Sequence, residues 1–375
     1  MVPKNEVYLE FAVVRLRDIF NTLHRMGPVI RDLKISTAIP DRISTTAFVI
    51  AFLDWAISPR SIAGDLIRVL ERVDVNVMEE DADTVMHKLT MKNEAKEAVV
   101  SWARFWCLNL LFPMMDRQLL GNLPEYWSIM ADIRHSVMQR DSNRCPVTGI
   151  YDTFTATNVE PQGTLAAVHI IPPRISYNKT AKTLISKFTG GQILPEHLSP
   201  ENIDAMDNTL MLSTTISTLF EQYRWSICPE RQGNPRFSFS VPGYHEEEHS
   251  YRLRKVADFY PPNTLSAPED SRILFGRGPP EGGVFVLPNP SYLRLHYSLV
   301  LILEATQAGK TISRIQHAMM RSGLGRRALV FWGDEMEVFL PTIYRRGMEC
   351  VLGVLQWYAE EAEAKAVRQR EKGGG

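Results

Sequence analysis

The segment from residue 165 to residue 223 constrains the fold most, because two kinds of pattern follow each other within it. Residues 165–171 form a short apolar run that Pro172 and Pro173 stop, which is typical of a strand. Residues 209–212 are strand-like again. Residues 214–223 then read as a helix, with Ser213 or Thr214 available as its N-cap. The sequence therefore predicts strand, strand and helix, in that order, in the middle of the chain.

Helical patterns dominate on both sides of this centre. Apolar residues recur at spacings of three and four. We expect helices over residues 7–23, 62–73, 93–112, 128–140, 292–306, 311–320 and 341–371, with Pro113 ending the third, and further strands at 225–227 and 236–241. The predicted fold class is α+β: a mostly helical chain around a small central module.

The length of 375 residues exceeds what one typical core supports. Proline and glycine cluster between residues 261 and 283, which is typical of a linker. We therefore predict a helical N-terminal region over 1–127, a central domain over 128–260, a linker over 261–283 and a helical C-terminal region over 284–375.

The charge balance excludes a protein that coats nucleic acid through a generally basic surface. The formal net charge is -1, which still allows a local basic groove. The four cysteines lie far apart, so neither a disulfide scaffold nor a zinc knuckle is indicated, and Cys145 is expected to serve packing. The longest apolar stretch, near residues 46–57, contains Asp54 and is too short to span a bilayer. With no signal-peptide pattern at the start, we expect an intracellular protein, cytoplasmic or nuclear, with no membrane partner.

His169 and Asn208 are the polar residues of the central segment with a chemical interpretation. His169 ends the first predicted strand, where a neutral imidazole is held rigidly and is able to take a proton from water. Asn208 opens the second strand, where its amide is placed to orient that ring. The helix that follows would offer side chains to a metal ion that polarises a phosphate. A buried histidine with a purely structural role is the alternative interpretation.

Further short motifs surround this pair in a fixed order: Arg134, Arg140-Asp141, Cys145-Pro146-Val147-Thr148-Gly149, Ala166-Ala167-Val168-His169-Ile170-Ile171-Pro172, Asp207-Asn208, Phe220 and the Leu287-Pro288-Asn289-Pro290 helix start that leads to His296. Together they resemble the HNH nuclease domain found in fungal proteins of unknown function, whose fold is the ββα-metal module. The resemblance covers roughly residues 128–315. Each motif is weak alone, and the ordered set is fairly specific.

The resemblance implies a role for each matching residue. His169 would be the general base, and Asn208 would position it. A histidine nine residues after the asparagine would bind a divalent metal, Mg, Mn or Zn. Ser217 stands at that position, and Glu221, one helical turn later, is a candidate replacement ligand. Val168 stands where metal-binding HNH sites often carry Asp or His. The implied activity is metal-dependent hydrolysis of DNA at a degenerate site.

Two other interpretations remain open. In the first, the domain is a non-catalytic scaffold for nucleic-acid or protein contact. Four basic residues in the predicted loop after His169 would then contact phosphates, or would belong to an ordinary solvated loop: Arg174, Lys179, Lys182 and Lys187. In the second, the chain is an interaction protein whose helical ends do the work.

Overall fold

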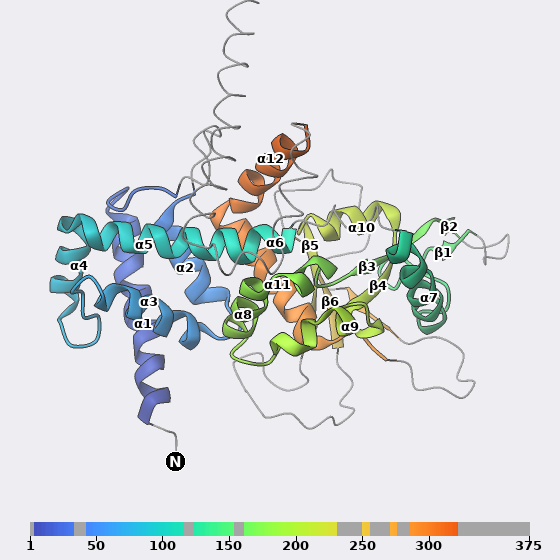
Figure 1. Ribbon diagram of the computed structural model, residues 1–375, viewed down its shortest axis with the longest axis horizontal. Helices are drawn as coiled ribbons and strands as arrows, with labels where there is room; N and C mark the ends of the chain where they lie inside the picture. Colours follow the sequence, from blue (N-terminus) through green and yellow to red (C-terminus); the bar gives the residue numbers. More distant parts are fainter. Residues whose placement is uncertain are drawn as a thin grey trace, which may run out of the picture.

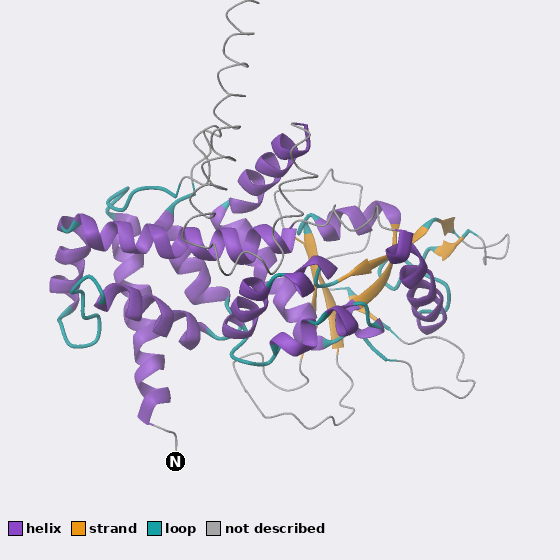
Figure 2. Ribbon diagram, viewed as in Figure 1, coloured by secondary structure: helices purple, strands orange, loops and turns teal. Residues whose placement is uncertain are grey.

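The computed structural model describes residues 4–33, 43–115, 124–153, 161–230, 250–255, 271–275 and 286–321. Within these ranges the chain is an α+β fold, as predicted, with helices around short strands. Figure 1 shows the N-terminal helices at one end of the molecule and the strands at the other, and Figure 2 colours the two classes. The expected strand over 236–241 and the expected helix over 341–371 lie outside the described residues.

The N-terminal region is helical, as predicted. Its elements are α1 (Lys4–Arg25), α2 (Thr45–Trp55), α3 (Pro59–Glu71), α4 (Ala82–Met91) and α5 (Asn93–Trp106). Local chemistry sets where these helices begin. Ser44 accepts a hydrogen bond from the backbone N–H of Ala47, Asp81 accepts one from Thr84, and Pro59 occupies the first turn of α3. α1 and α2 pack on each other and on α3.

Pro113 does not end the helix that precedes it, contrary to the sequence prediction. A π-helical stretch, η1 (Cys107–Leu111), continues α5 into α6 (Phe112–Met115). The wider turn gives bonds of the i to i−5 kind, such as the one from Phe112 N–H to the Cys107 carbonyl. This local change of pitch lets the chain pass Pro113, which has no N–H to donate.

The continuous helix Asn93–Met115 is long and apolar enough to cross a bilayer by length and composition. However, 72% of its most apolar window is buried within the protein. This burial is typical of the core helix of a globular fold.

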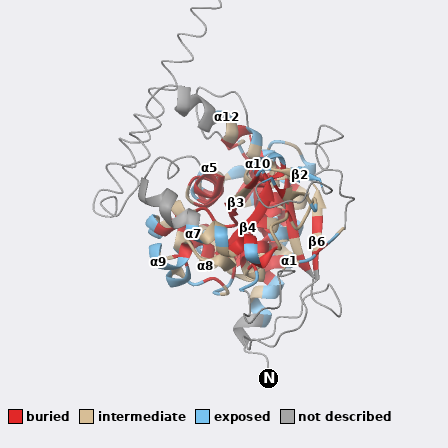
Figure 3. Cartoon of the chain, turned by 90° about the vertical axis from the view of Figure 1, so that its right-hand side faces the viewer, coloured by how far each residue is buried: buried red, intermediate tan, exposed pale blue. Residues whose placement is uncertain are grey.

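The central segment forms the predicted strand, strand and helix. β3 (Leu165–His169) pairs antiparallel with β4 (Thr209–Ser213), so that Leu165 faces Ser213 and His169 faces Thr209. α10 (Thr214–Glu221) follows β4 directly and packs against both strands. Figure 3 shows that β3 and β4 are among the most buried parts of the molecule.

α7 (Pro124–Arg140) packs against this pair of strands. Arg134 in α7 donates to the buried carboxylate of Asp152 at 3.2 Å and to the carbonyl of Leu165 at 3.4 Å. Asp152 belongs to β1 (Tyr151–Asp152), which pairs with β2 (Gln162–Gly163). The free, buried Cys145 lies in the turn between α7 and β1, where its Sγ accepts from the N–H of Thr148, in agreement with the predicted packing role.

A set of short helices connects β3 to β4: η2 (Pro173–Tyr177), α8 (Lys179–Phe188), η3 (Pro195–Leu198), α9 (Pro200–Ile203) and η4 (Met206–Asn208). The loop that we predicted for Lys179, Lys182 and Lys187 is therefore wrong, because all three residues belong to α8. Asn178 caps this helix by accepting from the N–H of Ala181 at 2.9 Å.

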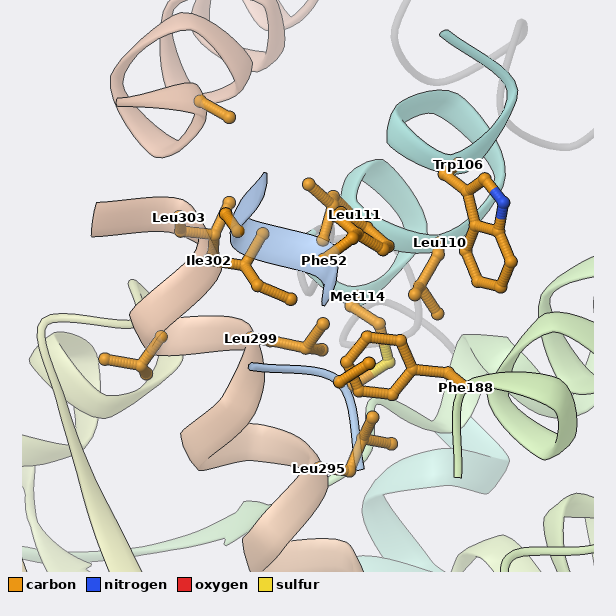
Figure 4. Packing of buried hydrophobic residues seen from close by; sticks show 14 of the residues in the cluster. Phe52, Trp106, Leu110, Leu111, Met114, Phe188, Leu295, Leu299, Ile302 and Leu303 are labelled. Atoms are coloured by element: carbon orange, nitrogen blue, oxygen red, sulfur yellow. The ribbon is translucent and has the colours of Figure 1, made fainter. Parts of the chain in front are cut away.

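α8 joins the central segment to the N-terminal helices. Phe188 packs edge-on against Phe52 of α2 with ring centroids 5.9 Å apart, and its carbonyl accepts from the N–H of Ser58 at 2.9 Å. Figure 4 shows Phe52 and Phe188 together with Leu295 and Leu299 of α11 in one apolar cluster. The buried apolar residues form a continuous core from Ala12 to Ile312.

The C-terminal part adds a sheet and two helices. β5 (Trp225–Glu230), β6 (Ser250–Lys255) and β7 (Arg272–Ile273) pair antiparallel in that order. β7 lies inside the segment predicted as a linker, so that segment contributes Arg272 and Ile273 to the sheet. α11 (Pro290–Thr306) begins at the predicted Leu-Pro-Asn-Pro motif with Asn289 as N-cap, and α12 (Ala308–Arg321) follows it.

The contact between Phe52 and Phe188 makes a prediction about stability. Phe52→Ala removes a fully buried ring that also packs on Trp102 and Trp106. We expect the free energy of unfolding, measured with urea, to fall by roughly 3–5 kcal/mol. Trp55→Ala, on the exposed side of the same helix, is the matched control and is expected to cost much less. Equal losses in the two variants would contradict the shared core.

Candidate functional site

His169 occupies the last position of β3, as the sequence predicted. Its residue is only 4% exposed. The next residue, Ile170, donates its N–H to the carbonyl of Asn208 at 2.8 Å, and Pro172 and Pro173 turn the chain into η2. The strand pairing and the proline turn thus fix the backbone on both sides of the imidazole.

Asp204 is the charged neighbour of this imidazole, and sequence reasoning missed it. Nε2 of His169 lies 2.9 Å from Oδ1 of Asp204, which is in the turn after α9. Two lone pairs facing each other at this distance would repel, so the proton of a neutral ring belongs on Nε2. A protonated Nε2 does not accept a proton from water, so Nδ1 is the nitrogen of this buried ring that is left for that role. Residues 169 and 204 lie in different elements, and no helix or strand periodicity in the sequence relates them.

The side chain of Asn208 forms hydrogen bonds with backbone groups near His169. Its amide Nδ2 donates to the carbonyls of Ile171 and Ile203 at 2.9 and 2.8 Å, and its Oδ1 accepts from the N–H of Ile171 at 2.8 Å. The expected bond from the amide to the imidazole is replaced by these three backbone bonds. Asn208 therefore positions His169 through the chain that follows it and holds the turn that carries Asp204.

Arg140, at the end of α7, fixes the same turn from the other side. Its fully buried guanidinium donates to both carboxylate oxygens of Asp141, at 3.0 and 2.8 Å. It also donates to the carbonyls of Met206 and Thr209, at 3.0 and 3.1 Å, on either side of Asn208. Because each of its three nitrogens has an acceptor, the guanidinium is stabilised in the interior and sets the start of β4.

The segment before α11 closes over this turn. Arg140 also donates to the carbonyl of Val286 at 3.4 Å, and the N–H of Asn289 donates to the carbonyl of Asp207 at 2.8 Å. The amide of Asn289 approaches the carboxylate of Asp207 at 3.4 Å. Burial raises the pKa of Asp207, and the hydrogen bond from Asn289 opposes this shift. The Leu-Pro-Asn-Pro motif is thus joined to the residue beside Asn208.

Ser217 lies in α10 and is bonded within its own helix. It is buried, and its Oγ donates to the carbonyl of Thr214 at 2.9 Å. Ile216, which precedes Ser217, accepts a hydrogen bond at its carbonyl from the indole N–H of Trp225 at 3.0 Å. Glu221, the candidate replacement ligand, is partly exposed at the end of α10.

Comparison with known protein families assigns this arrangement. Residues 145–228 match the family model of the HNH endonucleases. An HNH nuclease domain lies in the middle of this chain. The match begins at Cys145 and includes β3, β4 and α10, in agreement with the resemblance drawn from the motifs. Searches of curated proteins and of solved structures found no match.

The side chains around the HNH site do not fit a divalent metal. Among the described residues, no group of three or more His, Cys, Asp or Glu side chains is placed to share an ion. Ser217 supplies a hydroxyl that is bonded within its own helix, and Val168 is a buried apolar residue. Transition metals prefer imidazole and thiolate ligands, whereas Mg²⁺ usually requires carboxylates.

The four basic residues predicted to contact phosphates differ in their exposure to solvent and in their partners. Lys187 forms an ion pair with Asp65 of α3 at 2.7 Å, and so it ties the HNH domain to the N-terminal helices. Lys179 is exposed, whereas Arg174 and Lys182 are partly buried. Lys182 lies close enough to Glu201 to lower the pKa of that carboxyl, after the larger effects of hydrogen bonds from Ser199 and the Glu201 backbone.

His296 of α11 packs against aromatic side chains at the end of α10 and just after it. Its ring stacks between Phe220 at 3.9 Å and Tyr223 at 4.4 Å. Nδ1 lies 2.8 Å from Oγ of Ser226, and Nε2 lies 3.2 Å from the carbonyl of Phe220. The motif that contains His296 was recognised in the sequence, but its partners were not, because they lie about seventy residues earlier in the chain.

The contacts of Asn208 make a prediction that separates a structural from a catalytic asparagine. Asn208→Ala removes three hydrogen bonds and leaves backbone groups of Ile171 and Ile203 buried without partners. We expect the free energy of unfolding to fall by roughly 3–5 kcal/mol. Asn202→Ala, which removes one exposed bond to the carbonyl of Glu196, is the control and should cost under ~1 kcal/mol. If both variants were as stable as the wild type, the fastening role of Asn208 would be wrong.

Proposed function

We propose that this protein is an HNH-nuclease-like protein that no longer hydrolyses DNA and uses its HNH domain as a scaffold. The family match supports the nuclease-like domain. The residues at the site support the loss of hydrolysis, and the way the domain is joined to its neighbours supports the scaffold role.

The burial of His169 and its contact with Asp204 together carry the proposal. A general base must direct a nitrogen without a proton at the water molecule that it activates. In this chain Nε2 lies 2.9 Å from the carboxylate of Asp204, which leaves Nδ1 as the nitrogen for a base, and the residue is only 4% exposed to water. Losing general-base assistance typically costs about 10²- to 10⁴-fold in rate.

Ser217 adds a second, independent loss. Metal ions contribute several kcal/mol of charge stabilisation in phosphoryl chemistry, on the order of what a general base contributes. The Ser217 hydroxyl is bonded to the carbonyl of Thr214, and Glu221 is the acidic residue of the same helix. One partly exposed carboxylate and one buried hydroxyl make a poor ligand set for Mg, Mn or Zn.

The scaffold role follows from the contacts of the HNH domain with both ends of the chain. α8 is held to α2 and α3 by Phe188 and Lys187, and α10 is held to α11 by His296. A nuclease domain that is merely appended to other domains needs no such shared core. Here the module connects the N-terminal helices to α11, and so it determines how these helices are presented to partners.

Contact with DNA is a second candidate, and α8 is the element that favours it. Lys179 is exposed and Lys182 is partly exposed on this helix, which follows β3 and η2 in the chain. Phosphate contacts by lysine give binding that weakens steeply with salt. Fluorescence anisotropy with a labelled duplex tests this candidate. Lys179→Ala with Lys182→Ala should abolish any binding, whereas Lys96→Ala should not.

The proposed loss of hydrolysis is tested with supercoiled plasmid. We expect the wild-type protein to leave the plasmid intact in Mg²⁺, Mn²⁺ or Zn²⁺, as does His169→Ala. The double variant Asp204→Ala, Ser217→His removes the carboxylate from the imidazole and supplies the missing ligand. Nicking by that variant, lost again on adding His169→Ala, would identify these two positions as the cause of the loss.

Cutting of the plasmid by the wild-type protein would contradict the proposal. Metal-dependent cutting that disappears in His169→Ala would mean that the site works with Ser217 in place, and Glu221→Gln would then show whether the glutamate is a ligand. Circular dichroism of each variant controls for folding.

A further inference from the structure

A groove lies at the junction between the N-terminal helices and the HNH domain. Its volume of about 430 Å³ is within the range of small-molecule sites in proteins. α1 contributes Tyr8 and Leu9 to its lining, α3 contributes Gly64 and residues on either side of it, and α8 contributes Lys187. The N-terminal region and the HNH domain therefore share one concave surface, which we call the junction groove.

The middle of the junction groove is apolar and is shaped by a glycine. Gly64 lies in the interior of α3, where glycine costs about 0.5–1 kcal/mol of stability relative to alanine. A Cβ at this position would lie 3.3 Å from a methyl carbon of Leu9, which is a tight contact. The glycine lets α1 approach α3 and keeps the space between Leu9 and Ile67 open, so that the groove offers an apolar surface to the body of a ligand.

Two cations that line the junction groove share a single carboxylate. Nζ of Lys187 lies 2.7 Å from Oδ1 of Asp65, and a guanidinium nitrogen of Arg68 lies 3.4 Å from the same oxygen. The other oxygen, Oδ2, accepts from the indole N–H groups of Trp102 and Trp106, at 3.2 Å each. Asp65 therefore neutralises one of the two positive charges, and one remains in excess beside the groove.

The same two cations keep donors for a further acceptor. An ammonium group has three N–H donors, and a guanidinium has five. Within the described part of the chain, Lys187 uses one of its donors on Asp65, and Arg68 uses two, on Asp65 and on the carbonyl of Gly64. The Arg68 side chain is 62% exposed. A phosphate group matches this arrangement, because its oxygens accept several charge-assisted hydrogen bonds.

Glu71 limits the ligand to one phosphate. It is the last residue of α3 and lines the junction groove together with Tyr8. Burial raises the pKa of Tyr8, and the charges of Glu71 and Glu79 raise it further, so the phenol is protonated at neutral pH. A second phosphate near Glu71 would be repelled. The carboxylate and the phenol instead offer an acceptor and a donor to hydroxyl or amino groups of a ligand.

These features together select a ligand with an apolar body, one phosphate, and hydroxyl or amino groups. The side chain of Tyr8 is half-exposed where it lines the groove, and aromatic rings of this kind stack with nucleobases. We propose that the junction groove binds a nucleoside monophosphate, with its phosphate at Arg68 and Lys187 and its base against Tyr8. The site is separate from His169 and Asn208, so the proposal holds whether or not the HNH domain hydrolyses DNA.

Isothermal titration calorimetry of the full chain with adenosine 5′-monophosphate tests this proposal. The wild type should bind with a dissociation constant on the order of 10⁻⁴ M, because Arg68 and Tyr8 remain largely open to solvent. Adenosine, which lacks the phosphate, should bind at least about tenfold more weakly. Ribose 5-phosphate, which lacks the base, should also bind more weakly.

Two pairs of variants locate the ligand. Arg68→Ala should weaken binding of the monophosphate roughly tenfold through the loss of a charge-assisted hydrogen bond. Arg72→Ala changes an exposed arginine of the next turn that does not line the groove, and it should have little effect. Tyr8→Ala should weaken binding of the monophosphate and leave that of ribose 5-phosphate unchanged. Phe11→Ala, which changes an exposed ring elsewhere on α1, is its control. Circular dichroism confirms that each variant is folded.

Three outcomes would overturn the proposal. The first is a wild type that binds no adenosine 5′-monophosphate up to ~10 mM. The second is binding that adenosine matches, which would show that no phosphate is recognised. The third is binding that survives Arg68→Ala and is lost in Lys179→Ala. This result would place the nucleotide on the exposed side of α8, on the surface that is the candidate for DNA contact.

Discussion

The buried guanidinium of Arg140 is the interaction on which the centre of this structure depends. A charge in the interior is tolerated only when it is paired and its donors are satisfied. Arg140 meets this condition with the Asp141 carboxylate and the carbonyls of Met206 and Thr209, and its guanidinium lies 5.6 Å from the Phe275 ring. The turn from 204 to 209 therefore has one position relative to α7, and β4 begins where that turn ends.

The candidate site inherits its geometry from this turn. Asp204 comes from its start and Asn208 from its end, and His169 lies opposite Thr209 on β3. The same fastening that would hold a catalytic histidine in place here holds it against a carboxylate. The helix that carries Ser217 is packed through Phe220, Trp225 and His296. These side-chain contacts hold β3, β4 and α10 together within the described residues.

Local patterns in the sequence predicted much of this fold. The apolar run before Pro172, the Asn208 start of β4 and the spacing of α10 depend on neighbours in the chain, so each was readable. The contact between His169 and Asp204 was not, because two segments 35 residues apart have no common period. The same reason explains the missed pair Lys187–Asp65 and the strand β7 inside the proline-rich segment. The π-helical stretch before Pro113 was missed because proline normally ends a helix.

Metal linkage measured on the intact protein tests the central claim that this HNH domain is held together without an ion. A ligand that binds only the folded state raises the melting temperature as its concentration rises above its dissociation constant. We predict that the melting temperature of the wild type is the same in EDTA and in Mg²⁺, Mn²⁺ or Zn²⁺, and that His169→Ala behaves alike. A melting temperature that rises with one of these metals in the wild type, but not in His169→Ala, would contradict the account.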